Sequence, residues 1–253
     1  MILNHKNGMS FFQFPNLARF PELWHGVFTR HGGVSPSPFH SLNTALSVGD
    51  DVNNPYQNRE RILQIIGNGE LVSAKQVHGK EVIIFSEDRK YPDMPLIGDA
   101  MISDMIGKYL LIQTADCQAV FLYDPIRRVA GNIHSGWRGS VLNIIAHTIH
   151  AMTQYFGSDP RDISAGICPS LGPCCAEFIR YKEEIPEVYW KYKDDNHYFD
   201  FWAISEEQLR DAGVLPQNIQ TTRICTRCRT DLFFSYRGEK ITGRCAAIIG
   251  LER

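Results

Sequence analysis

The alternation of apolar and polar positions predicts several strands and three helices along the chain. Short apolar runs predict strands at residues 81–85, 109–113, 119–123, 128–134 and 163–167, and further strands near 231–236 and 244–250. Apolar residues recur every three to four positions between Ser140 and Phe156, which predicts an amphipathic helix that ends at Gly157. Residues 203–212 predict another helix, ended by Gly213.

A further helix is predicted at Pro55–Ile66, with Asn53 or Asn54 as its cap and Gly67 at its end. The predicted strands occur in groups as well as alternating with helices. This order favours an α+β fold with mixed sheets layered between helices over a regular parallel α/β sheet. Because no linker, repeat or low-complexity tract divides the chain, we expect a single domain over residues 1–253.

Composition and charge exclude several classes of protein. The formal net charge of −2 gives no electrostatic case for nucleic acid as a partner, and the hydrophobic content of 43% excludes disorder as the main state. The most apolar window, residues 109–123, is too short and too polar to span a membrane. No secretory signal is visible, so we expect a cytoplasmic protein.

Seven cysteines, an odd number at irregular spacing, do not resemble a disulfide framework. In a reducing compartment, such cysteines point to metal binding, catalysis or burial. Cys225 and Cys228 form a single C-x-x-C pair, which we interpret as ordinary thiols because no second such pair accompanies it. The adjacent Cys174 and Cys175 predict a packing role in a turn.

Three short segments place a histidine or cysteine in a turn-like context beside a predicted strand. They contain His78 in QVHG, Cys117 in TADC and His134 in HSGWRG. Two imidazoles and one thiolate are a competent zinc set, and three protein ligands leave a fourth position for water or substrate. The same residues also allow nucleophilic catalysis, with Cys117 as nucleophile, His78 or His134 as base and Asp116 as orienting group. The spacing does not separate these alternatives.

Arginines in glycine-rich stretches are candidates for binding an anion. Arg30 and Arg138 both neighbour flexible backbone, from which a guanidinium can present two donors to a phosphate. A salt bridge at a turn is the alternative for each. No Walker A or Rossmann pattern is present. No His-x-His pair occurs among the nine histidines, which counts against a multicopper cluster.

The order of these motifs resembles that of the YfiH-like laccase-domain family. The resemblance covers HGVFTRHGGVS at 25–35, SLN at 41–43, QVHG at 76–79, GDAMISD at 98–104 and TADC at 114–117. It continues through HSGWRG at 134–139, GPCC at 172–175, CTRC at 225–228 and DLFFSYR from 231, followed by TGR at 242–244. Ser135, Ala176 and Gly238 depart from the family's usual residues, and Gly238 removes an arginine that could contact an anion.

The resemblance implies an α/β/β/α layered fold and zinc bound by His78, Cys117 and His134, with copper as the alternative metal. It implies phosphorolysis of adenosine, inosine and S-methyl-5′-thioadenosine to free base and ribose 1-phosphate, together with adenosine deamination. We therefore expect a purine nucleoside and phosphate as small-molecule partners. We predict that four residues contact them: Arg30, Asn43, Gln76 and Arg138. A copper polyphenol oxidase and a cysteine hydrolase that edits peptidoglycan precursors are the alternative functions.

Overall fold

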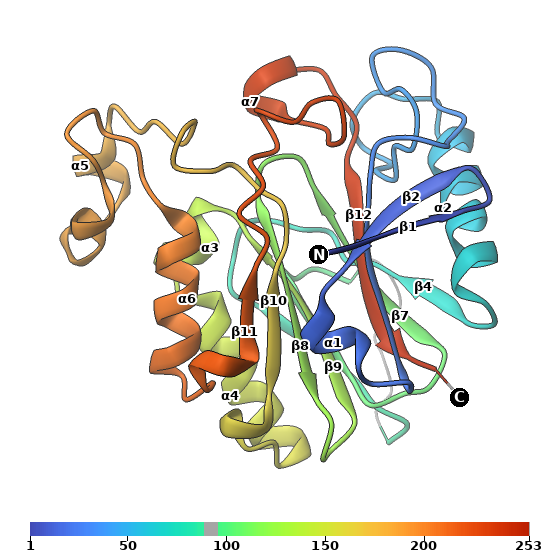
Figure 1. Ribbon diagram of the computed structural model, residues 1–253, viewed down its shortest axis with the longest axis horizontal. Coiled ribbons are helices and arrows are strands. Elements are labelled where there is room, and N and C mark those ends of the chain that lie inside the picture. The colour runs from blue at the N-terminus through green and yellow to red at the C-terminus, as the bar shows by residue number, and fades with distance from the viewer. Residues whose placement is uncertain (89–95, 253) are drawn as a thin grey trace.

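Two six-stranded mixed sheets, face to face and flanked by helices, form the computed structural model of the chain (Figure 1). The structure describes residues 1–88 and 96–252. The first sheet, sheet I, has the strand order β1 (Ile2–Lys6), β2 (Met9–Gln13), β3 (Leu23–Phe28), β12 (Cys245–Leu251), β7 (Lys108–Thr114) and β4 (Glu70–Val72). Sheet II has the order β11 (Ile219–Thr221), β10 (Ser164–Ile167), β8 (Gln118–Asp124), β9 (Val129–Ser135), β6 (Ala100–Ser103) and β5 (Val82–Phe85).

Helices cover the outer face of each sheet. Helix α2 (Asn53–Ile66) packs on sheet I, whereas α3 (Trp137–Val141), α4 (Ile144–Phe156) and α6 (Phe201–Asp211) lie on the side of sheet II (Figure 1). The shorter helices are α1 (Pro15–Ala18), α5 (Tyr181–Glu184) and α7 (Tyr236–Glu239), with 3-10 turns at Pro160–Asp162, Glu187–Tyr192 and Pro216–Asn218. The predicted α/β/β/α layering is confirmed, and neither sheet closes into a barrel. The single domain over 1–253 stays a prediction.

Period-two alternation along the central strands explains why both faces of each sheet are buried. In β7, Leu110 and Ile112 enter the core between the sheets, while Leu111 faces α2. In β8, Phe121 enters the same central core and Leu122 faces α4. Alternate side chains point to opposite faces of a strand, so these runs supply the central core and an outer core at once.

A buried asparagine joins the two sheets by hydrogen bonds. The Asn132 side chain in β9 donates from Nδ2 to the carbonyl oxygen of Leu110 in β7 at 2.8 Å and to that of Ala247 in β12 at 2.9 Å. Asn132 is fully buried. A buried amide without partners would be costly, so these two bonds fix how sheet II lies on sheet I.

Most predicted elements are present, with three differences. Residues 231–236 form no strand: Phe233 donates to the carbonyl of Arg229 in a turn, and Ser235 then caps α7. Helix α2 begins at Asn53, so neither predicted asparagine caps it through its side chain. The stretch from Ser140 is broken by Asn143, whose left-handed backbone (φ 53°) ends α3 and whose side chain caps α4. Gly157 ends α4 as predicted.

Candidate metal centre

Two connections that cross from sheet I to sheet II bring the predicted ligands together. His78 lies in the connection from β4 to β5, and Cys117 lies in the turn from β7 to β8. His134 lies in β9, where its backbone is opposite Ala119 of β8. This register places His134 beside the beginning of β8 and therefore beside Cys117.

The ligand atoms of His78, Cys117 and His134 all lie within 4.8 Å of one another. The Cys117 Sγ is 3.8 Å from the His78 Nε2, and the two imidazole rings are edge-to-face with centroids 4.8 Å apart. Tetrahedral zinc with one thiolate and one imidazole ligand requires a sulfur–nitrogen separation of about 3.6 Å. The donor set and its spacing therefore fit a divalent metal such as zinc, with a fourth position left open.

Asp99 orients two of the three ligands. Its Oδ1 accepts from His134 Nδ1 at 2.8 Å and from the His78 backbone N–H at 2.9 Å. Its Oδ2 accepts from the backbone N–H groups of Val77 and Gly79. Because a carboxylate only accepts, His134 Nδ1 carries a proton, and Nε2 is the nitrogen that would bind a metal. Sequence reasoning missed Asp99, although it lies within the quoted GDAMISD motif.

Electrostatics favour the anionic, ligating form of Cys117. Burial acts to raise the pKa of this thiol, but the neighbouring His134 and His78 outweigh burial and lower the pKa to about 6. Burial likewise opposes the charge of Asp99, yet its hydrogen bonds from His134 and from the backbone of Gly79 and Val77 lower the pKa of this carboxyl. Thiolate and carboxylate are the forms that metal ligation and ligand orientation require.

Both ligand turns have unusual backbone conformations, and a glycine gives them room. His78 and Asp116 have positive φ angles of 60° and 88°, which non-glycine residues rarely adopt. A Cβ added at Gly136 would lie 2.7 Å from the His78 Cδ2 and 3.0 Å from the Cys117 Sγ. Only glycine therefore allows these two ligands to approach the end of β9.

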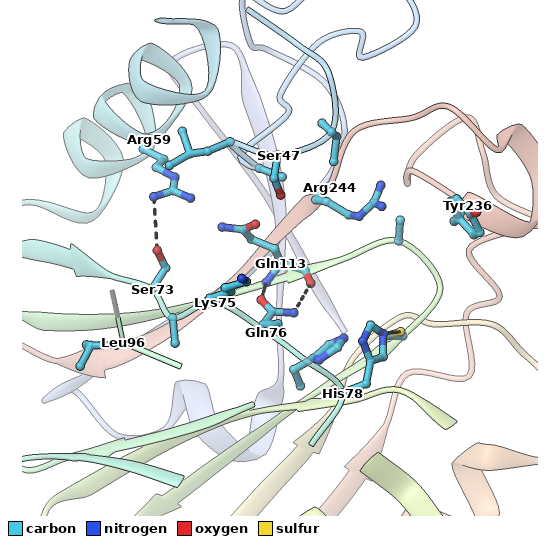
Figure 2. Close-up of a pocket in the computed structure, with 17 residues that line it drawn as sticks. Ser47, Arg59, Ser73, Lys75, Gln76, His78, Leu96, Gln113, Tyr236 and Arg244 are labelled. Carbon is cyan, nitrogen blue, oxygen red and sulfur yellow. Dashed lines mark hydrogen bonds between the residues drawn. The ribbon is translucent and has the colours of Figure 1, made fainter. Parts of the chain in front are cut away.

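A cavity of about 700 Å³ opens beside the ligands and is rich in cationic side chains (Figure 2). His78, Cys117 and His134 line it together with Gln76, Arg59, Lys75 and Arg244. Arg59 comes from α2 and donates to Ser73 Oγ at 3.3 Å, whereas Arg244 directly precedes β12. Burial lowers the pKa of both guanidinium groups, but each remains charged at neutral pH.

A second cavity of about 320 Å³ shares His78, Cys117 and Tyr236 with the first. Its lining includes the aromatic side chains of Trp137, Phe178 and Phe201 beside the charged Asp116 and Arg237, and we refer to it as the aromatic cavity. His78 and Cys117 thus line both the cationic and the aromatic cavity, whereas His134 lines the cationic one.

Of the predicted substrate contacts, Gln76 lines a cavity, whereas Asn43 has a supporting position. Gln76 lines the larger cavity, where its side chain donates to the carbonyl of Gln113 and accepts from its N–H. Asn43 is buried, and its side chain donates to Asp50 and accepts from the Arg244 backbone N–H. Asn43 therefore supports the segment that carries Arg244.

The two predicted phosphate contacts line neither cavity within the described part of the chain. The Arg30 guanidinium donates to Glu239 at 2.8 Å, to the carbonyl of Thr230 at 2.8 Å and to that of His40 at 3.0 Å. The Arg138 guanidinium lies over the Trp137 ring, 5.0 Å from its centroid. Sequence reasoning missed Arg59, Lys75 and Arg244; for Arg244 the available signal was its place in the TGR motif.

The sequence predicted ordinary thiols for Cys225 and Cys228 and a packing role for Cys174 and Cys175, and it did not predict that the two pairs meet. The structure gathers Cys174, Cys175, Cys225 and Cys228 into one cluster whose sulfur atoms lie within 4.8 Å of one another. The parallel pairing of β10 with β11 brings the two segments together, and β11 was not predicted from the sequence.

The fold and the site define a two-sheet α/β protein with a candidate metal centre of two histidines and one cysteine. The sequence pattern of the family described as multi-copper polyphenol oxidoreductase laccase matches residues 24–252, so the chain belongs to this family. The predicted relationship to YfiH-like laccase-domain proteins is thereby confirmed.

Named relatives are described as purine nucleoside phosphorylases. The chain is 31% identical over 243 residues to purine nucleoside phosphorylase YlmD of Geobacillus stearothermophilus, covering 89% of each protein. It is 30% identical over 233 residues to purine nucleoside phosphorylase YfiH of Escherichia coli, covering 88% of this chain and 91% of that protein. The crystal structure of hypothetical protein YfiH of Bacillus licheniformis has a TM-score of 0.88 at 29% identity and matches 99% of both chains.

Proposed function

We propose that the chain is a zinc-dependent purine nucleoside phosphorylase. It would convert adenosine, inosine and S-methyl-5′-thioadenosine to the free base and the corresponding ribose 1-phosphate. The observation that carries this proposal is the ligand group of His78, Cys117 and His134, two of which, His78 and Cys117, line both a cationic and an aromatic cavity. An anion and a purine need these two different environments side by side. The names of the relatives support the same activity.

The cationic cavity suits phosphate. In phosphorolysis a phosphate oxygen forms a bond to the anomeric carbon, while the bond from that carbon to the purine nitrogen breaks and its electrons leave with the base. Arg59, Lys75 and Arg244 supply positive charge on the side of the incoming phosphate, and a guanidinium holds two phosphate oxygens at once. We therefore assign phosphate binding to these residues in place of Arg30 and Arg138.

The aromatic cavity suits the purine base. Trp137, Phe178 and Phe201 line it, and offset or edge-to-face stacking of such rings with a base is favourable. Tyr236 lines both cavities and therefore lies where base and ribose would meet. When zinc is bound by His78, Cys117 and His134, it supplies Lewis acidity at this boundary.

The donor set favours zinc over copper. Catalytic zinc sites commonly have three protein ligands, and the combination of cysteine and histidine is among them. A copper site built on two histidines and one cysteine usually adds a weak axial methionine. Among the described residues that line the two cavities, none is a methionine.

Adenosine deamination is the second activity in the proposal, and it requires a group that moves protons. Asp116 is the one carboxylate among the described lining residues of the two cavities. Its Oδ1 accepts from Thr226 Oγ1 and its Oδ2 from the Arg237 N–H, both at 2.6 Å. The Asp116→Asn variant should lose deamination more than phosphorolysis, as followed by ammonia release and ribose 1-phosphate formation in one sample.

We place this activity in the reducing cytoplasm, where a thiolate ligand such as Cys117 stays reduced. Within the described residues, the structure contains no helix long and apolar enough to cross a bilayer.

The proposal is tested with apoprotein reloaded with zinc or copper. Zinc-loaded protein with inosine and phosphate should release hypoxanthine and ribose 1-phosphate in equal amounts, and omission of phosphate should stop both. If only the copper-loaded protein is active, and it consumes oxygen with a phenol faster than free copper does, the oxidase alternative is right. If thiol alkylation blocks turnover of a peptidoglycan precursor while metal chelation does not, the cysteine hydrolase alternative is right.

A further inference from the structure

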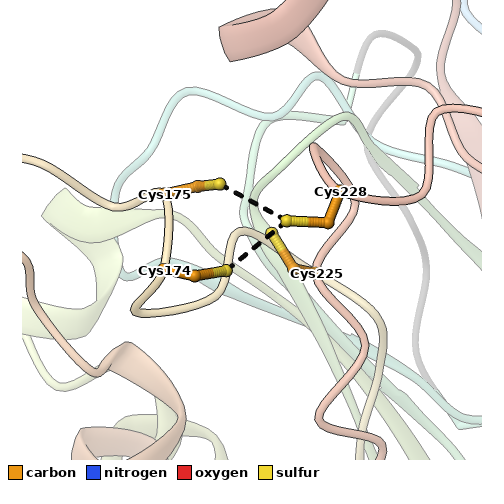
Figure 3. Close-up of side chains that lie close together, drawn as sticks. All are labelled: Cys174, Cys175, Cys225 and Cys228. Atoms are coloured by element: carbon orange, nitrogen blue, oxygen red, sulfur yellow. Dashed lines mark hydrogen bonds between the residues drawn. The ribbon is translucent and has the colours of Figure 1, made fainter.

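A second group of metal-ligating side chains lies apart from the candidate catalytic centre. It consists of Cys174 and Cys175, which follow β10, and Cys225 and Cys228, which follow β11 (Figure 3). We refer to these residues as the four-cysteine cluster. Because β10 and β11 are parallel neighbours, their carboxyl ends lie side by side, and the segments that follow them leave sheet II at the same end of the strands. The cluster shares no residue with His78, Cys117 and His134.

The spacing of the sulfur atoms matches a tetrahedral thiolate site. The Cys228 Sγ lies 3.6 Å from the Cys174 Sγ and 3.6 Å from the Cys175 Sγ. All four sulfur atoms lie within 4.8 Å of one another. Zinc–sulfur bonds of about 2.3 Å in a tetrahedron place neighbouring sulfur atoms about 3.8 Å apart. A disulfide requires a separation of about 2.05 Å.

Backbone hydrogen bonds stabilise the two segments that carry the four-cysteine cluster. Ser170 donates to the carbonyl of Ile224, and the N–H of Thr226 donates back to the carbonyl of Ser170. The backbone N–H groups of Gly172 and Cys228 donate to the Cys225 sulfur. Such amide donors offset the negative charge of a thiolate ligand.

The cluster is also close to a cation and to solvent. Cys174 and Cys228 are exposed, whereas Cys175 and Cys225 are buried. The Arg237 guanidinium donates to the carbonyl of Glu177 at 3.0 Å and reaches the carbonyl of Cys175 at 3.5 Å. A metal ion can therefore enter from the exposed side, where the Arg237 side chain lies against the backbone of Cys175.

We propose that the four-cysteine cluster binds one zinc ion as a closed structural site, separate from the catalytic metal. Four thiolates fill the tetrahedral coordination of zinc and leave no open position for substrate, as structural zinc sites require. Adjacent cysteines contribute two of the ligands, and the C-x-x-C pair contributes the other two. The chain then holds two zinc ions of different coordination.

An ion bound at the four-cysteine cluster would also stabilise the turn that carries Cys117. Leu171, three residues before Cys174, donates its N–H to the carbonyl of Asp116 at 2.8 Å. Thr226, next to Cys225, donates its hydroxyl to the Asp116 carboxylate at 2.6 Å. Zinc at the cluster therefore ties together two segments that both hold the turn carrying Cys117. This role does not depend on which reaction the catalytic centre performs.

Zinc content per chain, measured on protein purified with reductant, tests the proposal. Wild type should hold two zinc ions, and Cys228→Ser should hold one. The matched control is Cys168→Ala, because Cys168 is a buried thiol outside both groups; this variant should keep two. The proposal is overturned if Cys228→Ser and wild type hold the same amount of zinc.

X-ray absorption at the zinc edge tests the same proposal without changing the cluster. In the Cys117→Ala variant, which disables the catalytic centre, the remaining zinc should have four sulfur neighbours at about 2.3 Å. Nitrogen neighbours in this variant, or no bound zinc, would contradict the proposal. A mass that shows a disulfide between Cys228 and either neighbour would likewise contradict it. None of these readouts uses enzyme activity, so failure here is distinct from failure of the proposed function.

Discussion

Asp99 and His134 form a hydrogen bond of 2.8 Å between a fully buried carboxylate and the imidazole nitrogen that faces away from the candidate metal position. The same carboxylate receives the backbone N–H groups of Val77, His78 and Gly79. One side chain therefore fixes both the tautomer of one ligand and the turn that presents another. This arrangement is the carboxylate–histidine pairing typical of metal centres.

Replacing Asp99 by Asn should weaken metal binding by about 10- to 100-fold, the range for loss of a group that orients a ligand. The new amide would direct N–H donors at backbone N–H groups and would remove the negative charge that supports His134. Competition with a chromogenic chelator measures the affinity. Asp104→Asn is the control, because Asp104 is an exposed carboxylate that lines neither cavity. Equal zinc affinity in the Asp99→Asn and Asp104→Asn variants would contradict the assigned role.

Replacing Gly136 by Ala should abolish metal binding by His78, Cys117 and His134 while the chain still folds. The added methyl group would overlap His78 and Cys117, at 2.7 and 3.0 Å. Gly139→Ala is the matched control, because its nearest neighbours are at an ordinary 3.5 Å and alanine is favourable within a helix. Calorimetric titration with zinc compares the two variants. Wild-type zinc affinity in Gly136→Ala would show that the ligands do not converge as described.

Replacing Arg244 by Met should raise the KM for phosphate by about 10- to 100-fold, corresponding to about 1.5–3 kcal/mol for a hydrogen bond to a charged group. The KM for inosine should change much less. Arg30→Met distinguishes this assignment from the one made on sequence alone. Arg30 pairs with Glu239, so its loss should act mainly on stability. A larger rise in phosphate KM for Arg30→Met than for Arg244→Met would favour Arg30 as the phosphate ligand.

The three candidate ligands and the central strands of the fold could be predicted from the sequence. Strands β7, β8 and β9 are long apolar runs next to His134 and Cys117, and their patterning is strong enough to place both residues at strand ends. Residues 231–236 were predicted as a strand from their apolar run, and the structure buries Phe233 and Phe234 in a turn. Burial of an apolar run does not reveal whether its backbone pairs with a strand.

Other features depend on contacts between distant segments, which a single sequence does not display. Asp99 acts through backbone groups of another loop, so no motif of spaced side chains marks its role. Arg59 reaches the cavity from the face of α2, where an arginine is an ordinary surface residue. The four-cysteine cluster requires the pairing of β10 with β11, and β11 is three residues long. Such a short strand gives no usable alternation.

The buried imidazole of His25 should make stability depend on pH. Burial lowers its pKa from 6.5 to about 4, whereas unfolding returns it to about 6.5. Between these values the unfolded chain binds a proton that the folded chain does not, so the free energy of unfolding falls as the pH falls. The loss is about 1.4 kcal/mol per pH unit and totals about 3 kcal/mol near pH 4.

Urea unfolding of wild type and His25→Gln between pH 4 and pH 7 isolates this contribution from that of the carboxylates. Glutamine can still accept the hydrogen bond that the Phe14 N–H donates to His25 Nε2 at 2.8 Å. The difference between the two proteins should therefore shrink as the pH falls from 6.5 to 4. A difference that stays constant over this range would show that His25 keeps an ordinary pKa in the folded chain.

The most direct test of the account is the rate at which wild type and Cys117→Ala form ribose 1-phosphate from inosine and phosphate, with zinc in excess. Wild type should form ribose 1-phosphate and hypoxanthine in equal amounts. Cys117→Ala should be inactive while keeping the fold, as shown by an unchanged far-UV spectrum. Equal rates in both proteins, or no ribose 1-phosphate from zinc-loaded wild type, would contradict the proposal that His78, Cys117 and His134 hold the catalytic metal of a nucleoside phosphorylase.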